Sequence, residues 1–157
     1  MKDGTDSGSR TPAGTTGDNT ERTGLRPHGT HGLIHGATTN SILSAAYRVH
    51  GSLGPGLLER VYHTCLCHEL GRLGIHYSSE KPMPVSYDGI DFELGYRVDL
   101  LVEKKVIVEI KAVEEVLPIH KAQLLTYLRL SRIRVGLLIN FGAARLRDGI
   151  TRRVVGS

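Results

Sequence analysis

The sequence predicts an α/β domain in which a mixed central β-sheet is flanked by helices. Three observations support this class. Apolar residues recur at helical spacing over residues 39–49 and 57–73, and the period shortens towards two over residues 76–113. A short, continuous apolar run then occupies residues 135–140, as is typical of a strand that is buried on both faces. The expected order is two helices, three or four strands, a third helix and a further strand.

The expected helices begin and end at recognisable capping and breaking residues. Thr39 or Asn40 caps the first helix, and the segment 51–56, which is rich in glycine and proline, separates it from the second. Pro118 opens the third helix at its first turn, and this helix extends to about Ser131.

The expected strands are divided by turn residues. Prolines at positions 82 and 84 and the Asp-Gly pair at 88–89 separate the strands of residues 76–113. A last short strand is expected around residues 152–155. The chain contains no internal repeat.

Length and composition exclude several classes of protein. At 157 residues, 39% of them hydrophobic and 5% aromatic, the chain has apolar material for one core. No uninterrupted apolar stretch reaches the roughly 18 residues of a membrane span, and the N-terminal residues have no apolar segment of the secretory type. Cys65 and Cys67 are too close in sequence for a disulfide between them to link distant parts of a domain. A disulfide-rich secreted scaffold is therefore excluded, and a cytoplasmic location is expected.

Residues 1–36 differ in composition from the rest, and we expect them to form a disordered N-terminal tail. They consist mainly of Gly, Thr, Ser, Asp and Arg, so little apolar surface offsets the entropy of ordering. The four basic and four acidic residues of this segment cancel, and the net charge of +4 therefore belongs to residues 37–157. We expect those residues to form one domain, whose basic character permits a polyanionic partner without requiring one.

Two predicted strands, residues 96–102 and 106–113, place two carboxylates opposite each other. Side chains alternate along a strand, so one face of this hairpin is apolar. The residues expected on that face are Tyr96, Val98, Leu100, Val102, Val106, Val108, Ile110 and Ala112. The shortest register that keeps them together pairs Val102 with Val106 and therefore Asp99 with Glu109. Their Cβ atoms would lie about 5 Å apart.

Like charges in that position are destabilising unless something compensates for them. Lys111, two residues beyond Glu109 on the same face, is one compensating group, and a divalent cation shared by both carboxylates is another. Mg²⁺ suits such a site because it takes one or two carboxylates and keeps several waters. The alternative is a solvated strand face with an ordinary ion pair.

The residues Asp99 and Glu109-x-Lys111 resemble the signature of the PD-(D/E)XK nuclease superfamily, which has the restriction-endonuclease-like fold. More closely, Gly56-Leu-Leu-Glu59-Arg-Val-Tyr62 is similar to the GxxExxY proteins, a branch of that superfamily. The resemblance covers nearly everything from residue 40 onwards. It implies a core of helices, a three-stranded meander, a helix and a further strand. Val98 stands where the family has a proline before the metal-binding aspartate.

The resemblance also implies a metal-dependent catalytic site, with Mg²⁺ or Mn²⁺ as the cofactor. Its residues would be Glu59, Asp99, Glu109 and Lys111. The three carboxylates would serve as metal ligands, and Lys111 would orient or deprotonate the attacking water. For Glu59, an alternative is a glutamate that is favoured at a helix N-terminus by the helix dipole.

Gln123 and Tyr127 are further candidates for substrate binding. They are four residues apart on the third helix and so share a face. The alternative is the polar edge of an amphipathic helix.

Histidine and cysteine residues near position 65 raise the question of a zinc site. On a helix, Cys65 and Cys67 point about 200° apart and cannot share an ion. Only His63 and Cys67 are suitably spaced, and two ligands do not make a structural zinc site. His50 and His120 could lie near the carboxylates, although surface or capping roles are more common for such residues.

The C-terminal 29 residues hold a concentration of arginine. The seven are Arg129, Arg132, Arg134, Arg145, Arg147, Arg152 and Arg153, against one acidic residue. Arginine suits bidentate contacts with phosphate, so these residues could follow a nucleic acid backbone. They could equally serve solubility.

The sequence therefore predicts a metal-dependent nuclease that hydrolyses phosphodiester bonds in nucleic acid, with DNA favoured over RNA. The alternative function is a nucleic-acid- or partner-binding module that keeps the fold with little catalytic activity. A small homodimeric interaction protein is compatible with either.

Overall fold

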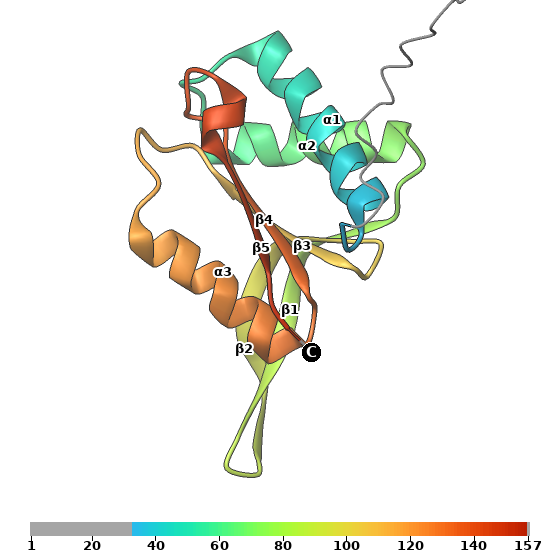
Figure 1. Ribbon diagram of the computed structural model, residues 1–157, viewed down its shortest axis with the longest axis vertical. Coiled ribbons are helices and arrows are strands. Elements are labelled where there is room, and N and C mark those ends of the chain that lie inside the picture. The colour runs from blue at the N-terminus through green and yellow to red at the C-terminus, as the bar shows by residue number, and fades with distance from the viewer. Residues whose placement is uncertain (1–32, 157) are drawn as a thin grey trace, which may run out of the picture.

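The computed structural model describes residues 33–156, so most of the predicted tail lies outside the described residues. The elements in chain order are α1 (Gly36–Leu53), α2 (Glu59–Arg72), β1 (Tyr77–Tyr87), β2 (Ile90–Val102), β3 (Val106–Lys111), α3 (Pro118–Ser131), β4 (Val135–Asn140), the 3₁₀ helix η1 (Leu146–Gly149) and β5 (Ile150–Val154). Figure 1 shows their arrangement. No helix within residues 33–156 is long and apolar enough to cross a membrane.

The five strands form one mixed sheet in the order β1-β2-β3-β4-β5. Strands β3 and β4 are parallel and α3 connects them, whereas the other neighbouring pairs are antiparallel. A crossover helix is the usual link between parallel neighbours. The predicted fold class, an α/β domain with a mixed sheet and flanking helices, is confirmed, and residues 76–113 contain three strands.

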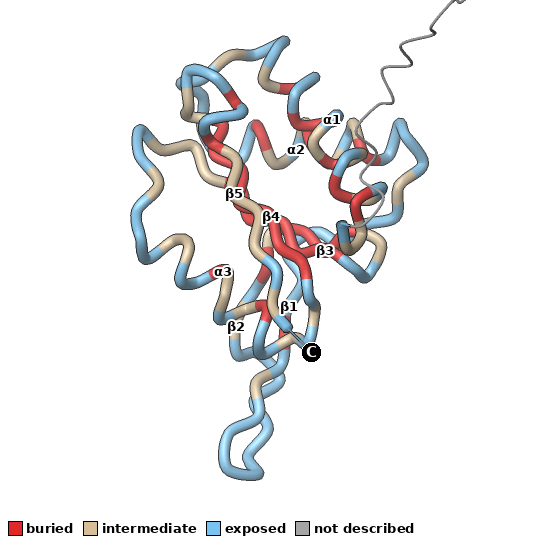
Figure 2. The backbone as a smooth tube through the Cα atoms, viewed as in Figure 1, coloured by how far each residue is buried: buried red, intermediate tan, exposed pale blue. Residues whose placement is uncertain are grey.

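Helices cover both faces of the sheet and bury two apolar clusters, which Figure 2 shows along its centre. Residues of α1 and α2, including Ile42 and Leu66, pack on one face against the alternating core residues of β3 and β4. On the other face, Leu124 and Leu128 of α3 pack against Ile107 and Leu138. Strand β4 is buried along its whole length, as its apolar run predicts.

The expectation that one face of β2 is continuously apolar is wrong beyond Leu100. Leu100 and Val102 pack in the cluster beneath α1 and α2, as expected. Val98 and Tyr96 belong instead to the cluster beneath α3. The backbone ladder with β3 ends at the pair Leu100↔Val108, so β2 leaves its partner there and the twist of a long strand is free to turn its next residues towards α3.

The first two helices also differ from prediction at their ends. Helix α1 begins at Gly36, after His35 in the left-handed conformation, and continues through Gly51 to Leu53. A single glycine is tolerated there because α1 packs along the sheet, and tertiary packing outweighs local propensity. Helix α2 begins at Glu59 rather than at residue 57.

A buried tyrosine fixes the loop that precedes α2. The hydroxyl of Tyr62 donates a hydrogen bond to the carbonyl oxygen of Gly54 (2.6 Å) and accepts one from the backbone N–H of Leu57 (3.0 Å). Its ring stacks on Phe141, with ring centroids 4.8 Å apart. The loop is thereby tied to the core, and Glu59 is held at the first position of α2.

We predict that Tyr62→Phe lowers the free energy of unfolding by about 1 to 3 kcal/mol, because the stack is kept while two hydrogen bonds are lost. Denaturant unfolding followed by circular dichroism measures the change. Tyr47→Phe is the matched control, since Tyr47 is 47% exposed. Equal stability of the Tyr62→Phe variant and the control would show that the hydroxyl does not hold the loop.

Candidate active site

The site begins where β2 and β3 separate. Their ladder pairs Val102 with Val106 and Leu100 with Val108, which confirms the predicted register. At the next position, side chains take the place of backbone acceptors. Asp99 Oδ2 accepts a hydrogen bond from the N–H of Ile110 (2.7 Å). Glu109 Oε1 accepts one from the N–H of Asp99 (3.2 Å).

These two bonds bring the carboxylates of Asp99 and Glu109 together, as the register predicts. Each bond uses one carboxylate oxygen, so the second oxygen of each side chain remains for a ligand. The strands thus hold two carboxylates in fixed positions at an opening in the sheet.

Glu109 is buried, with 6% of its surface exposed. Burial and, after it, the neighbouring Asp99 carboxylate raise the pKa of Glu109 to about 8. The hydrogen bond from the Asp99 N–H and the charge of Lys111 act in the opposite direction. The sequence predicts this unfavourable pairing of the Asp99 and Glu109 carboxylates, and it predicts Lys111 as a group that partly compensates for it.

Glu59 approaches the pair from the N-terminus of α2. It lines a pocket of about 530 Å³ together with Asp99 and residues of α2 and β1. Burial raises the pKa of Glu59, while the charge of Lys111 lowers it and the charge of Asp99 raises it. The four residues Glu59, Asp99, Glu109 and Lys111 therefore lie within electrostatic reach of one another.

The donor set fits a divalent ion of the Mg²⁺ type. Carboxylate oxygens are hard ligands, and Mg²⁺ is held by one or two of them while it keeps several waters. Within residues 33–156, no group of three or more His, Cys, Asp or Glu side chains is arranged to hold a metal ion. The predicted set of three carboxylate ligands, Glu59, Asp99 and Glu109, is therefore not brought together as a closed metal site, although Asp99 and Glu109 lie side by side.

Helix α3 brings Gln123 and Tyr127 to the same region. The Gln123 Nε2 group donates a hydrogen bond to the Tyr127 hydroxyl (2.6 Å), so the two share a face as predicted. Burial raises the pKa of Tyr127, and the charges of Glu109 and Asp99 raise it as well, whereas the hydrogen bond with Gln123 lowers it. The Tyr127 ring stacks on Tyr96 at a centroid separation of 4.3 Å.

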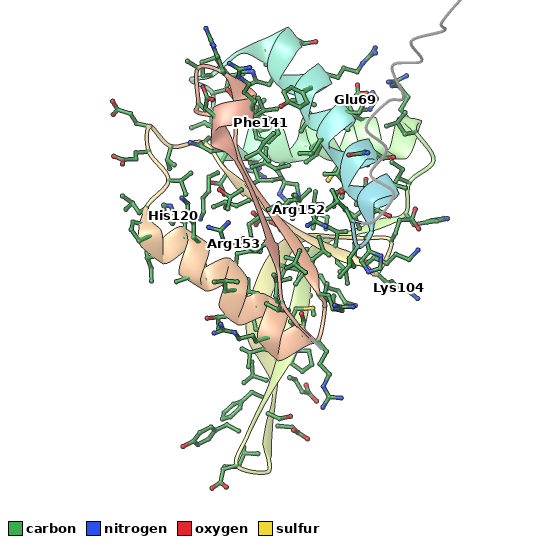
Figure 3. The ribbon with its side chains drawn as sticks, viewed as in Figure 1. Glu69, Lys104, His120, Phe141, Arg152 and Arg153 are labelled. Carbon is green, nitrogen blue, oxygen red and sulfur yellow. The ribbon has the colours of Figure 1, made fainter. Side chains whose placement is uncertain are left out.

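His120 lies near the site, as the sequence analysis considered, and it also has the capping role given there as the alternative. Figure 3 shows it at the start of α3. Its Nδ1 atom accepts a hydrogen bond from the backbone N–H of Leu117 (3.1 Å), and its ring lies close enough to Glu59 to influence the pKa of that carboxyl. No periodicity or motif marks this residue, because its position depends on the angle between α3 and the sheet.

Asn140 was missed by sequence reasoning. Its side-chain amide exchanges two hydrogen bonds with the backbone of Val113, at 3.0 and 2.9 Å, and its Oδ1 also accepts the N–H of Gly142. The N–H of Phe141 donates to the carbonyl oxygen of Lys111 (2.8 Å). The end of β4 therefore fixes the chain that follows Lys111.

The other histidines considered from sequence have separate contacts. His63 Nε2 lies 2.7 Å from Ser79 Oγ at the wall of the pocket. Cys67 is the residue that the sequence analysis paired with His63 as a possible zinc ligand, and burial raises the pKa of its thiol. His50 Nε2 lies 2.8 Å from the carbonyl oxygen of Ala143 and ties α1 to the segment after β4.

Comparison with known proteins identifies the superfamily of this chain. A family model described as the PD-(D/E)XK nuclease superfamily matches residues 36–154, and the chain belongs to this superfamily. Divalent metal ions are typical of its members. No curated protein matches the chain. A solved structure described as "Crystal structure of SSO0001" is similar, with 24% identity, a TM-score of 0.42 and 63% of this chain covered. This chain spans 50% of that protein.

We predict that the free energy of unfolding in metal-free buffer falls as the pH rises from 4.5 to about 8. Folded Glu109 keeps its proton up to about pH 8, whereas the unfolded chain loses it near the ordinary value of 4.5. Between these two pH values the folded state binds more protons than the unfolded state. The free energy of unfolding therefore decreases as the pH rises. Urea unfolding in the presence of EDTA measures the trend.

Glu109→Gln should flatten this pH dependence, because the amide does not titrate. Glu115→Gln, at an exposed position in the loop before α3, is the matched control. If wild-type protein and the Glu109→Gln variant show the same slope, the carboxyl of Glu109 is not the group responsible.

Proposed function

We propose that this chain is a metal-dependent nuclease of the GxxExxY branch, in which residues 37–157 form the catalytic domain behind an N-terminal tail. The supporting observation is the pair of carboxylates, Asp99 and Glu109, held at the opening of β2 and β3 beside Lys111. A purely structural strand pair gains nothing from opposed carboxylates, one of them buried.

In the proposed mechanism Asp99 and Glu109 hold Mg²⁺ or Mn²⁺, which when bound polarises a phosphodiester and lowers the pKa of water. Glu59 accepts a hydrogen bond from a water on the α2 side of the site. Lys111 orients the attacking water or takes its proton, and its charge favours the developing negative charge on phosphate. The Gln123–Tyr127 pair supplies donors to the substrate from α3.

The proposed substrate is nucleic acid, and we favour DNA. The C-terminal arginines do not act as one phosphate-binding surface, because several have other contacts. Arg152 Nη2 donates to the carbonyl oxygen of Ile34 (2.7 Å), and Arg153 Nη1 donates to that of Arg152 (3.1 Å). Figure 3 shows both on β5, whereas Arg129, Arg132 and Arg134 line a separate groove.

A binding module with little activity remains the second candidate. The observation in its favour is that, within residues 33–156, no group of three or more His, Cys, Asp or Glu side chains is arranged to hold a metal ion. Cleavage assays with and without metal distinguish the two functions.

We predict that Lys111→Met lowers the rate of DNA cleavage in Mn²⁺ by two orders of magnitude or more, on the scale of losing an acid–base or electrostatic group. The variant should fold and bind DNA, because Lys111 lies at the end of β3 with its side chain at the open site. Plasmid and linear DNA assays measure cleavage, and Lys105→Met, in the exposed β2–β3 turn, is the matched control. Wild-type protein that cuts no nucleic acid in either metal would favour the binding module.

We predict that Mg²⁺ or Mn²⁺ raises the melting temperature, because the ion binds only the folded state, where it takes the place of the Glu109 proton between the two carboxylates. Thermal unfolding during a metal titration measures the shift. The shift should vanish in the Asp99→Asn, Glu109→Gln double variant, which keeps the shape of both side chains. An equal shift in that variant would place the metal elsewhere.

A further inference from the structure

The β1–β2 hairpin extends beyond the body of the domain as an arm, here defined as residues 84–94 (Figure 1). Figure 2 shows this arm as almost wholly exposed. Cross-strand pairs Val85↔Phe92 and Tyr87↔Ile90 place their side chains on one face of the ribbon. That face is apolar and open to solvent, since Tyr87 is 72% and Ile90 57% exposed. Neighbouring Phe92 and Leu94 are 49% and 62% exposed.

The charge of the arm excludes a nucleic acid as its partner. Asp88, Asp91 and Glu93 lie on it, and residues 82–96 contain no lysine or arginine. No ion pair to any of these three acidic residues forms within residues 33–156. Phosphate would be repelled, so the partner must offer apolar surface together with positive charge.

Proline weakens the free edge of β1 as a site for pairing with another strand. Pro82 and Pro84 remove two backbone N–H donors there, next to the irregularity in register between Met83 and Val85. The larger feature that the arm offers to a partner is its exposed apolar face.

A groove of about 480 Å³ on the same chain has the complementary chemistry. Leu128 and Val155 contribute apolar surface, and the rest of the lining is three arginines, Arg129, Arg132 and Arg134, and Gly156. Within the described part of the chain, none of these arginines pairs with a carboxylate. Arg134 has only a long hydrogen bond of 3.5 Å to the carbonyl oxygen of Val155.

The arm and the groove lie at the same end of the molecule. Met83, at the root of the arm, packs in the cluster that includes Leu128 and Val155. The arm points away from the body, so its apolar face does not cover the groove of its own chain (Figure 1).

We propose that two copies of this chain associate by exchanging arms, each arm lying with its apolar face in the arginine-lined groove of the other copy. A two-fold axis near the arm roots makes both contacts at once, so the assembly closes as a dimer and doubles the buried apolar area. The long arginine side chains reach the acidic residues at the sides of the ribbon. This association is independent of the proposed catalytic activity.

Sedimentation equilibrium on the full chain tests the proposal. Wild-type protein should be dimeric at micromolar concentration. The arm variant Asp91→Lys, Glu93→Lys and the groove variant Arg129→Glu, Arg132→Glu should each be monomeric, with at least a tenfold weaker association. Mixing the two variants should restore a dimer, because one contact is then wild type and the other has both charges reversed.

Two matched controls carry the same changes of net charge at other exposed positions. Glu114→Lys, Glu115→Lys matches the arm variant, and Lys104→Glu, Lys105→Glu matches the groove variant. Both should remain dimeric. The proposal is overturned by a monomeric wild-type protein, which would leave the arm to a different protein partner. It is equally overturned by a groove variant that dimerises as wild type does, or by a mixture that stays monomeric.

Discussion

The structure depends on the point at which two antiparallel strands stop pairing through their backbones. At Asp99 and Glu109, side-chain oxygens accept the N–H groups of Ile110 and Asp99. The backbone donors are thus satisfied without a continuous ladder, and β2 is free to turn away from β3. The same bonds orient the two carboxylates side by side, where the charge of Asp99 disfavours ionisation of Glu109. The opening between β2 and β3 and the carboxylate pair at it are therefore one feature of the fold.

The elements around this opening are each fixed by a contact with the core. Tyr62 ties down the loop before α2 and so sets the position of Glu59. Asn140 ties down the chain after Lys111. On the opposite face, Gly136 allows close packing of α3, since a Cβ atom there would lie 2.7 Å from the Leu124 Cδ1 atom. Three segments distant in sequence thus meet at the carboxylates on rigid supports, which a catalytic site requires.

Sequence patterns predicted the strand register and the carboxylate pair because parity leaves few alternatives when one face must be buried. The same alternation places Lys111 on the side of Glu109, whereas Glu59 lies on helix α2 and was predicted from the family resemblance alone. Sequence patterns did not predict the features that depend on packing between elements. The side chain of Val98 lies beneath α3, because the twist of β2 turns it away from the face that strict alternation predicts. The residues around His120 depend on the angle at which α3 crosses the sheet. Helix α1 extends past Gly51 because packing overrides a local preference.

The proposed dimer leaves the candidate site open. The pocket that includes Glu59 and Asp99 shares no residue with the groove that includes Arg129 and Arg132. An arm seated in that groove would therefore leave this pocket uncovered, and a two-fold dimer would carry two accessible pockets. Dimer formation and the proposed metal-dependent activity are thus separable, and a variant that abolishes one is expected to keep the other.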